Sequence, residues 1–296
     1  MKKMSNPILF FGSGPVAKAS LQFILQHFDV EAIVTKPATK GEMAELVGNL
    51  AVFAVQNATE LDELMGKQQF QSKLGILVDF GVIVPKKVID TFQLGVVNSH
   101  FSLLPKLRGA DPITFAILEG HEKTGVSLML IDEKMDTGKL ITQKTLHIKP
   151  DATTPSLTRE LVELSNSLLA EYLPLYVSGK VKPRNQPHPD RATYTRKLVK
   201  EDGIIDWNKP AEQIEREVRA FAGWPGSRTE LAGKEVIVLG ARVVEDSNKP
   251  GNVSIRDKQL LIGTGKDSLV VDHLKPAGKN EMTGAEFIRG YLQNIR

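Results

Sequence analysis

The first 180 residues alternate between short apolar runs and stretches in which apolar residues recur at helical spacing. The apolar runs predict buried strands at residues 8–12, 30–35, 51–55, 73–81, 94–100, 125–131 and 139–148. The stretches between them predict helices at residues 15–28, 58–70, 85–92, 111–120 and 154–179. Strands that alternate with helices are joined by crossover connections and lie mostly parallel. We therefore expect an α/β fold with a Rossmann-like, mostly parallel sheet.

The pattern changes after residue 200. Short strand-like runs, divided by Gly, Asp or Asn, predict a small OB-like β-barrel from residues 235–244, 252–256, 259–263 and 268–274. Thr283 and Glu286 form a capping box that opens a last helix. A chain of 296 residues is long for a single core. We expect two domains, residues 1–180 and 201–296, joined by a linker at residues 181–200.

Basic charge is concentrated around the expected linker. Residues 180–200 carry seven Lys or Arg and one Asp, whereas the net charge of the whole chain is only +3. The same stretch contains Pro183, Pro187 and Pro189, which exclude a regular helix and favour an extended chain. The stretch is either a solvated connection or one that also binds a polyanion.

The composition excludes several classes of protein. The chain has no cysteine, which excludes disulfides and thiolate zinc sites and suits a reducing cytoplasm. No apolar run approaches the roughly 20 residues that a membrane span requires. The N-terminus lacks the pattern of a signal peptide. We expect a cytoplasmic monomer that does not associate with membranes.

A glycine-rich turn follows the first expected strand. Gly12, Ser13, Gly14 and Pro15 begin a match to the dinucleotide-binding fingerprint. A nicotinamide enzyme would carry an acidic residue at the end of the second strand, but the chain has Thr35 and Lys36 there. A lysine suits a 2′-phosphate, so NADP stays open. The other interpretation is a tight turn whose backbone amides meet a polar group of a substrate.

Polar side chains gather where a later strand ends. Asn98 and His100 are two residues apart, so on a strand they point to the same face. Asp136 follows the next long strand, in a turn of sequence Asp-Thr-Gly. The set suits acyl transfer, because an amide and an imidazole can donate to a developing oxyanion while a carboxylate orients the imidazole. A metal site of His100 with Asp132, Glu133 and Asp136 is the weaker interpretation, because ligand-type spacing is missing.

Two segments carry a resemblance to a known family. Residues 98–113, NSHFSLLPKLRGADPI, and residues 124–141, TGVSLMLIDEKMDTGKLI, together resemble the core of the 10-formyltetrahydrofolate-dependent formyltransferases. Residues 192–231 and 274–288 resemble the second domain of those members that formylate methionyl-tRNA. The resemblance spans essentially the whole chain. It implies transfer of a formyl group from the co-substrate 10-formyltetrahydrofolate to the α-amine of methionyl-initiator tRNA, for translation initiation.

Two alternatives stay open beside this resemblance. Family members that act on amino-sugar nucleotides share part of the sequence at residues 202–207, although the basic linker favours a tRNA substrate. A non-enzymatic RNA-binding protein with a degenerate Rossmann domain is the other alternative.

The resemblance also implies roles for individual residues. Asn98 and His100 would stabilise the oxyanion, and Asp136 would position His100 and assist proton removal. The folate would be bound by Ser102, Leu103, Leu104, Pro105, Phe80, Gly81, Val82, Ile83 and Asp132. The methionine would lie near Gly12, Ser13, Gly14 and Pro15. The tRNA would be held by Lys36, Lys40, Lys180, Lys182, Arg184, Arg191, Arg196 and Lys197. No metal is required.

One departure from the family concerns the segment after the second strand. Members that act on tRNA usually carry a longer basic, glycine-rich loop there, which resembles a flexible finger. Here the segment is only TKPATKGEMAELV, with Lys36 and Lys40 but no arginine. We therefore expect weaker tRNA discrimination at this loop, or discrimination by other residues. The Arg108–Gly109 pair is expected to fix the preceding bend onto the next helix.

Overall fold

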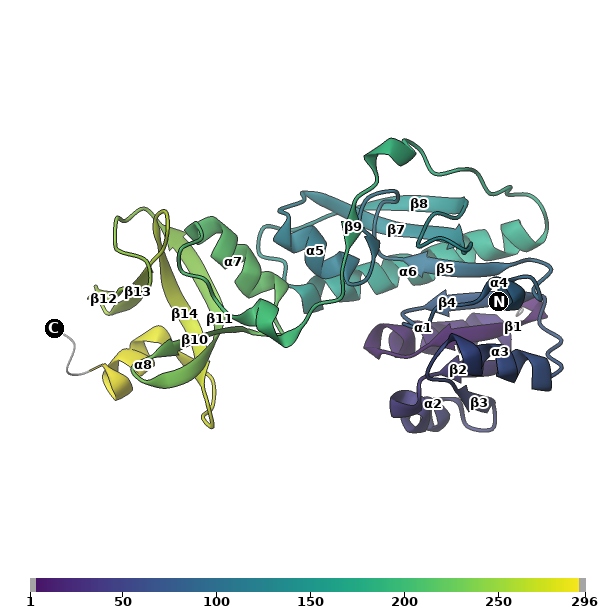
Figure 1. Ribbon diagram of the computed structural model, residues 1–296, viewed down its shortest axis with the longest axis horizontal. Helices are drawn as coiled ribbons and strands as arrows, with labels where there is room; N and C mark the ends of the chain where they lie inside the picture. The colour runs from purple at the N-terminus through teal and green to yellow at the C-terminus, as the bar shows by residue number, and fades with distance from the viewer. Residues whose placement is uncertain (1–3, 293–296) are drawn as a thin grey trace. The chain divides into compact units, whose positions relative to one another are not determined.

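The computed structural model describes residues 4–292 of the chain (Figure 1). The chain divides into two compact units. The first unit comprises residues 1–112, 123–147 and 158–195, and the second comprises residues 113–122, 148–157 and 196–296. Within the described range, no helix is long and apolar enough to cross a membrane.

A seven-stranded sheet organises the first unit, with strand order β3-β2-β1-β4-β5-β7-β8. Its strands are β1 (Met4–Gly12), β2 (Phe28–Thr35), β3 (Ala51–Ala54), β4 (Leu74–Val78), β5 (Val96–His100), β7 (Lys123–Leu130) and β8 (Leu140–His147). Strands β1 to β5 pair in parallel, whereas β7 pairs antiparallel with both β5 and β8. The predicted mostly parallel sheet is confirmed.

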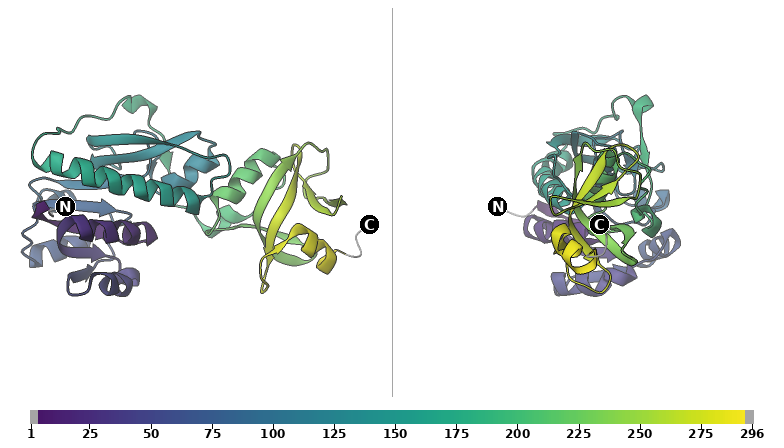
Figure 2. Two further views of the ribbon diagram at one scale, coloured as in Figure 1. Left: turned by 180° about the vertical axis from the view of Figure 1, so that it is seen from behind. Right: turned by 90° about the vertical axis from the view of Figure 1, so that its left-hand side faces the viewer.

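Helices cover both faces of this sheet. They are α1 (Pro15–His27), α2 (Lys40–Val47), α3 (Ala58–Lys67), α4 (Lys86–Ile89) and α6 (Thr154–Val177). The short strand β6 (Arg108–Gly109) precedes α5 (Pro112–Leu118), which belongs to the second unit from residue 113 onward. Helices α1 and α6 lie on one face, and α3 and α4 lie on the other (Figure 1; Figure 2). Leu9, Phe11, Val34 and Leu61 belong to the core under α3 and α4, where apolar burial supplies most of the stability.

Two predicted segments of the first unit take another form. Strand β4 ends at Val78 and not at residue 81, because Asp79 has a left-handed φ of 46° that a strand cannot accommodate. The short segment after β2 is helical, with a 3₁₀ turn at Pro37–Thr39 that leads into α2.

The second unit is built around an antiparallel sheet with strand order β10-β11-β14-β13-β12 and with β15 beside β14. Its elements are α7 (Ala211–Ala220), β10 (Ser227–Leu231), β11 (Lys234–Val244), β12 (Val253–Arg256), β13 (Gln259–Gly263), β14 (Ser268–Pro276), β15 (Met282–Thr283) and α8 (Gly284–Tyr291). Ile214, Leu260 and Phe287 are buried in its core. The Thr283–Glu286 capping box is present as predicted. The predicted fold class is confirmed.

Residues 180–195, the larger part of the basic stretch, belong to the first unit. It contains a 3₁₀ turn at Pro189–Arg191 and the short strand β9 (Tyr194–Thr195), which pairs with β6. Arg108 is buried and donates to Gln186 Oε1 at 2.7 Å and to the Tyr194 hydroxyl at 3.0 Å. The expectation that Arg108 fixes the bend onto the next helix is therefore wrong, because its guanidinium holds the basic stretch.

Candidate active site

His100 ends strand β5, and its ring is fixed by two neighbours. Its Nε2 lies 2.9 Å from the carbonyl oxygen of Leu107, which only a protonated Nε2 can satisfy. Its Nδ1 faces Oδ2 of Asp136 at 3.7 Å. The imidazole is 6% exposed. A second proton on this ring would therefore be carried by Nδ1, on the side where a carboxylate offsets the charge.

Asn98 lies two residues earlier on β5 and is also buried. Within the described part of the chain, its side chain forms no hydrogen bond with another residue. A buried amide normally has a partner, because an unmade hydrogen bond costs about 1–3 kcal/mol. This amide is therefore free to donate to a ligand oxygen.

Asp136 reaches the site from the loop between β7 and β8. Its Oδ2 accepts a hydrogen bond of 2.7 Å from the backbone N–H of Gly109, and its backbone oxygen accepts one of 2.7 Å from Gln186. Asp136 has a φ of 51°, a left-handed value that Asp tolerates better than most residues. The structure thus brings together the three residues of the expected catalytic set, and Gly109 fixes the carboxylate.

The expected folate residues separate into two groups. Phe80, Ser102, Leu104 and Pro105 are buried in packing, and the Ser102 hydroxyl donates to the Lys106 carbonyl oxygen at 2.6 Å. These four residues shape the bend rather than present a free surface. Leu103, Gly81, Val82, Ile83 and Asp132 are half-buried or exposed.

Two apolar side chains are unusually exposed in the loops near this group. Ile83 follows β4 and is 79% exposed, and Met135 directly precedes Asp136 and is 61% exposed. A contiguous apolar patch on a protein surface often marks a ligand contact, whereas single exposed apolar side chains are common. Met135 was not among the residues predicted from the sequence, and it lies directly beside Asp136 in the chain.

Asp79 packs against the glycine-rich turn at residues 12–15. The backbone N–H of Ser13 donates to the Asp79 carbonyl oxygen at 3.0 Å, and the Asp79 carboxyl group lies so close to Gly14 that a β-carbon there would collide with it. An anionic side chain therefore occupies the position beside the start of α1 where a dinucleotide pyrophosphate would bind. This arrangement favours the tight-turn interpretation over NADP binding.

Asp79 is also electrostatically unusual. Surrounding protein atoms and the nearby Asp111 carboxylate raise the pKa of its carboxyl group to about 6, although Lys36 opposes this shift. The side chain remains open to solvent on one side. The sequence did not identify Asp79 because it follows an uninterrupted apolar run and was placed inside the predicted strand.

The expected tRNA-binding cations lie at the surface, apart from the half-buried Lys36. Arg196 is already engaged, since its guanidinium donates to both carboxylate oxygens of Asp202 at 2.7 and 2.5 Å. Of the basic stretch, Lys180, Lys182, Arg184 and Arg191 lie in the first unit, while Arg196 and Lys197 lie in the second.

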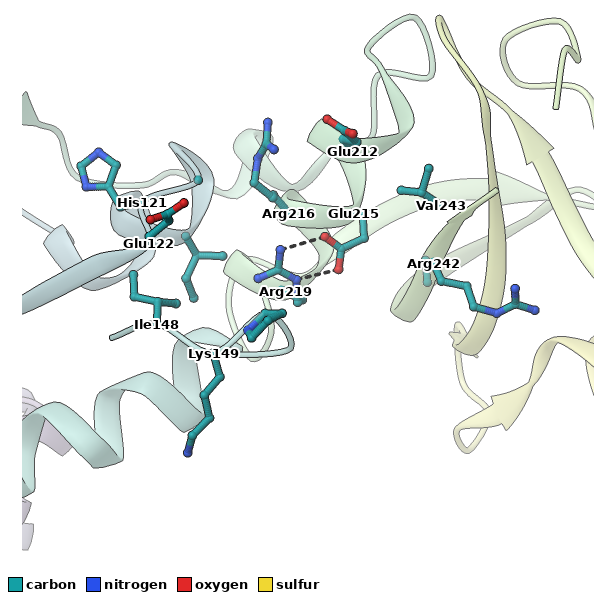
Figure 3. Close-up of a pocket in the computed structure, with 14 residues that line it drawn as sticks. His121, Glu122, Ile148, Lys149, Glu212, Glu215, Arg216, Arg219, Arg242 and Val243 are labelled. Carbon is teal, nitrogen blue, oxygen red and sulfur yellow. Dashed lines mark hydrogen bonds and ion pairs between the residues drawn. The ribbon is translucent and has the colours of Figure 1, made fainter. Parts of the chain in front are cut away.

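The second unit contains a pocket of about 510 Å³ (Figure 3). Arg219 lines it but is held by Glu215 through bonds of 2.6 and 2.8 Å. Among the described residues, the buried Nε of Arg216 has no hydrogen-bond partner. Glu122 and Glu212 add carboxylates to the same pocket. The mixture of charges does not define a site for a polyanion.

Comparison with known proteins identifies the family. The formyl transferase family model matches residues 26–173, and the model of the formyl transferase C-terminal domain matches residues 197–292. The chain is thus a formyl-transferring enzyme. Proteins named methionyl-tRNA formyltransferase from Roseiflexus castenholzii and Myxococcus xanthus are 36% and 37% identical to it, over 97% of this chain and 96% of each relative. The chain belongs to the methionyl-tRNA formyltransferase family.

Solved structures support the fold. HypX from Aquifex aeolicus matches with a TM-score of 0.69 at 19% identity, over 100% of this chain and 49% of that chain. The sugar 3N-formyl transferase WlaRD matches with a TM-score of 0.67 at 20% identity, over 94% of this chain and 100% of that chain. At these identities the likeness concerns the fold alone.

Proposed function

We propose that this enzyme transfers the formyl group of 10-formyltetrahydrofolate to the α-amine of methionyl-initiator tRNA, in the cytoplasm and as a monomer. The product is formylmethionyl-tRNA, which serves translation initiation. The observation that carries the proposal is the free amide of Asn98 beside His100, in a chain related over nearly its full length to methionyl-tRNA formyltransferases.

The chemistry follows from the three residues of the site. A free α-amine has a pKa of about 7.7–8.0, so part of it is neutral and nucleophilic at neutral pH. When it attacks the formyl carbon, the formyl oxygen becomes an oxyanion. Asn98 donates its amide hydrogen to that oxygen, and His100 donates through Nδ1 once the ring is charged. Asp136 stabilises the imidazolium and holds it in position.

The folate and the tRNA use different surfaces. Ile83 and Met135 provide exposed apolar surface for the pterin, and Val82 is half-buried beside Ile83. A solved structure of HypX is described as a complex with tetrahydrofolic acid, and its fold resembles this chain with a TM-score of 0.65. The exposed cations of the basic stretch suit a tRNA backbone.

One assay tests the proposed function. The full chain is incubated with 10-formyltetrahydrofolate and either methionyl-initiator tRNA or an amino-sugar nucleotide, and the formylated product is measured. Formylmethionyl-tRNA is expected. Formylation of the sugar nucleotide alone would contradict the proposal, as would tRNA binding without any formyl transfer.

A further inference from the structure

The catalytic set leaves one nearby carboxyl group unused, that of Asp79. Strand β4 lies beside β5 and pairs with it in parallel (Figure 1). In this pairing Leu77 lies opposite Asn98. Asp79 directly follows Val78, the last residue of β4, and His100 is the last residue of β5. Neighbouring strands are roughly 4.8 Å apart, so both residues lie at the same end of the sheet, where these parallel strands finish. Asp79 therefore belongs to the surroundings of the reacting groups.

The backbone of Asp79 is fixed, but its carboxyl group is not engaged. Its carbonyl oxygen accepts hydrogen bonds from the backbone N–H of Ser13 at 3.0 Å and from the Ser13 hydroxyl at 3.2 Å. Across residues 4–292, by contrast, no hydrogen bond to its carboxylate is present. The rigid turn thus presents a carboxylate that is open to solvent on one side.

The groups around Asp79 define what it can bind. Asp111 adds a second negative charge, and Lys36 is the positive charge that acts on it. His100 ends the neighbouring strand β5, and the Asp136 carboxylate lies 3.7 Å from its ring. With a pKa of about 6, Asp79 is mostly ionised at neutral pH. An ionised carboxylate without a bound donor favours a cationic partner.

The proposed acceptor supplies such a cation, because the α-amine of methionyl-tRNA is largely protonated below its pKa of about 7.7–8.0. We propose that Asp79 binds this primary ammonium group and takes its proton as the amine attacks. The nitrogen then bonds to the formyl carbon and the bond from that carbon to N10 of tetrahydrofolate breaks, while the second proton that the nitrogen loses is taken up by N10. This inference rests on the proposed function and adds a catalytic residue to it.

A binding experiment tests the first half of the proposal. Affinities of the full chain at pH 7 are measured for methionyl-tRNA and for the same tRNA carrying the α-hydroxy analogue of methionine. The wild type is expected to prefer the amine by about tenfold, as a charge-assisted hydrogen bond would give. Asp79→Asn is expected to bind both tRNAs equally. An unchanged preference in this variant would overturn the proposal, whether or not formylation occurs.

The pH dependence of kcat/KM tests the second half. If ionised Asp79 binds the ammonium form, kcat/KM of the wild type stays high down to about pH 6, where Asp79 becomes protonated. Asp79→Asn must use the free amine, so its kcat/KM falls below about pH 7.7–8.0 and is about 100-fold lower at pH 7. The fall of kcat/KM on the acid side of the profile is its acid limb. An identical acid limb in both proteins would refute proton transfer to Asp79.

Two neighbouring charges provide matched variants with opposite effects. Asp111 raises the pKa of Asp79, so Asp111→Asn is expected to move the acid limb of kcat/KM to lower pH. Lys36 lowers that pKa, so Lys36→Met is expected to move the limb to higher pH. Each profile is normalised to its own plateau, which removes any change in tRNA affinity. Shifts in the same direction, or none, would contradict proton transfer to Asp79.

Discussion

The Nδ1 atom of His100 lies 3.7 Å from Oδ2 of Asp136, while Nε2 of the same ring is held by the carbonyl oxygen of Leu107. This separation is too long for a direct hydrogen bond. The carboxylate therefore acts on the imidazole mainly through its charge, and a substrate oxygen or a water molecule can share the Nδ1 proton.

Removing this charge is expected to slow the reaction while the fold is kept. Asp136→Asn should lower kcat about 100-fold, because a charged imidazole loses its compensating carboxylate. The amide oxygen of the new residue can still accept the hydrogen bond from Gly109. Steady-state kinetics with saturating folate and tRNA measure the effect, and thermal melting checks the fold. A kcat within a factor of three of the wild type would exclude Asp136 from the mechanism.

Asn98→Ala tests the oxyanion donor. Loss of one such donor typically costs about 3–4 kcal/mol in the transition state, so turnover should fall about a hundredfold or more. The KM for 10-formyltetrahydrofolate should change little, because the donated hydrogen bond is strongest in the transition state. Since Asn98 holds no other residue among those described, its loss should barely affect melting. Near-normal turnover would contradict the assigned role.

Much of this arrangement could be predicted from residues close together in the sequence. Asn98 and His100 share a strand, and the period of two places them on one face. Asp79 could not be predicted, because a left-handed φ after an apolar run leaves no local signal. The partners of Arg108 could not be predicted either, because Gln186 and Tyr194 are distant in sequence and come close to it only in the folded chain.

Asp79 also predicts a specific dependence of stability on pH. Its pKa is raised from 3.8 to about 6 in the folded chain, so the folded state binds more protons than the unfolded state between these values. Its contribution to the free energy of unfolding therefore falls as pH rises from 4 to 6 and is constant above that range. Asp79→Asn has no ionisable group at this position, so this fall in the free energy of unfolding disappears.

The melting temperature of Asp79→Asn should accordingly match the wild type near pH 4 and exceed it above pH 6. Solvent on one side of the carboxylate keeps the difference small. Thermal unfolding of both proteins at several pH values between 4 and 8 measures it. A difference that does not grow between pH 4 and pH 6 would show that the Asp79 pKa is not raised in the fold.

Salt dependence distinguishes free cations from engaged ones on the proposed tRNA-binding surface. Lys182 is exposed, and its replacement by Gln should reduce the slope of log affinity against log salt by about one if its ammonium group neutralises a phosphate. Arg196 serves as the matched control, because Asp202 already neutralises its guanidinium. Arg196→Gln should therefore leave the slope almost unchanged.

Both variants are compared with the wild type by measuring initiator tRNA binding from low to physiological salt. If Arg196→Gln produced the larger change, the ion pair with Asp202 would have to open when the tRNA binds.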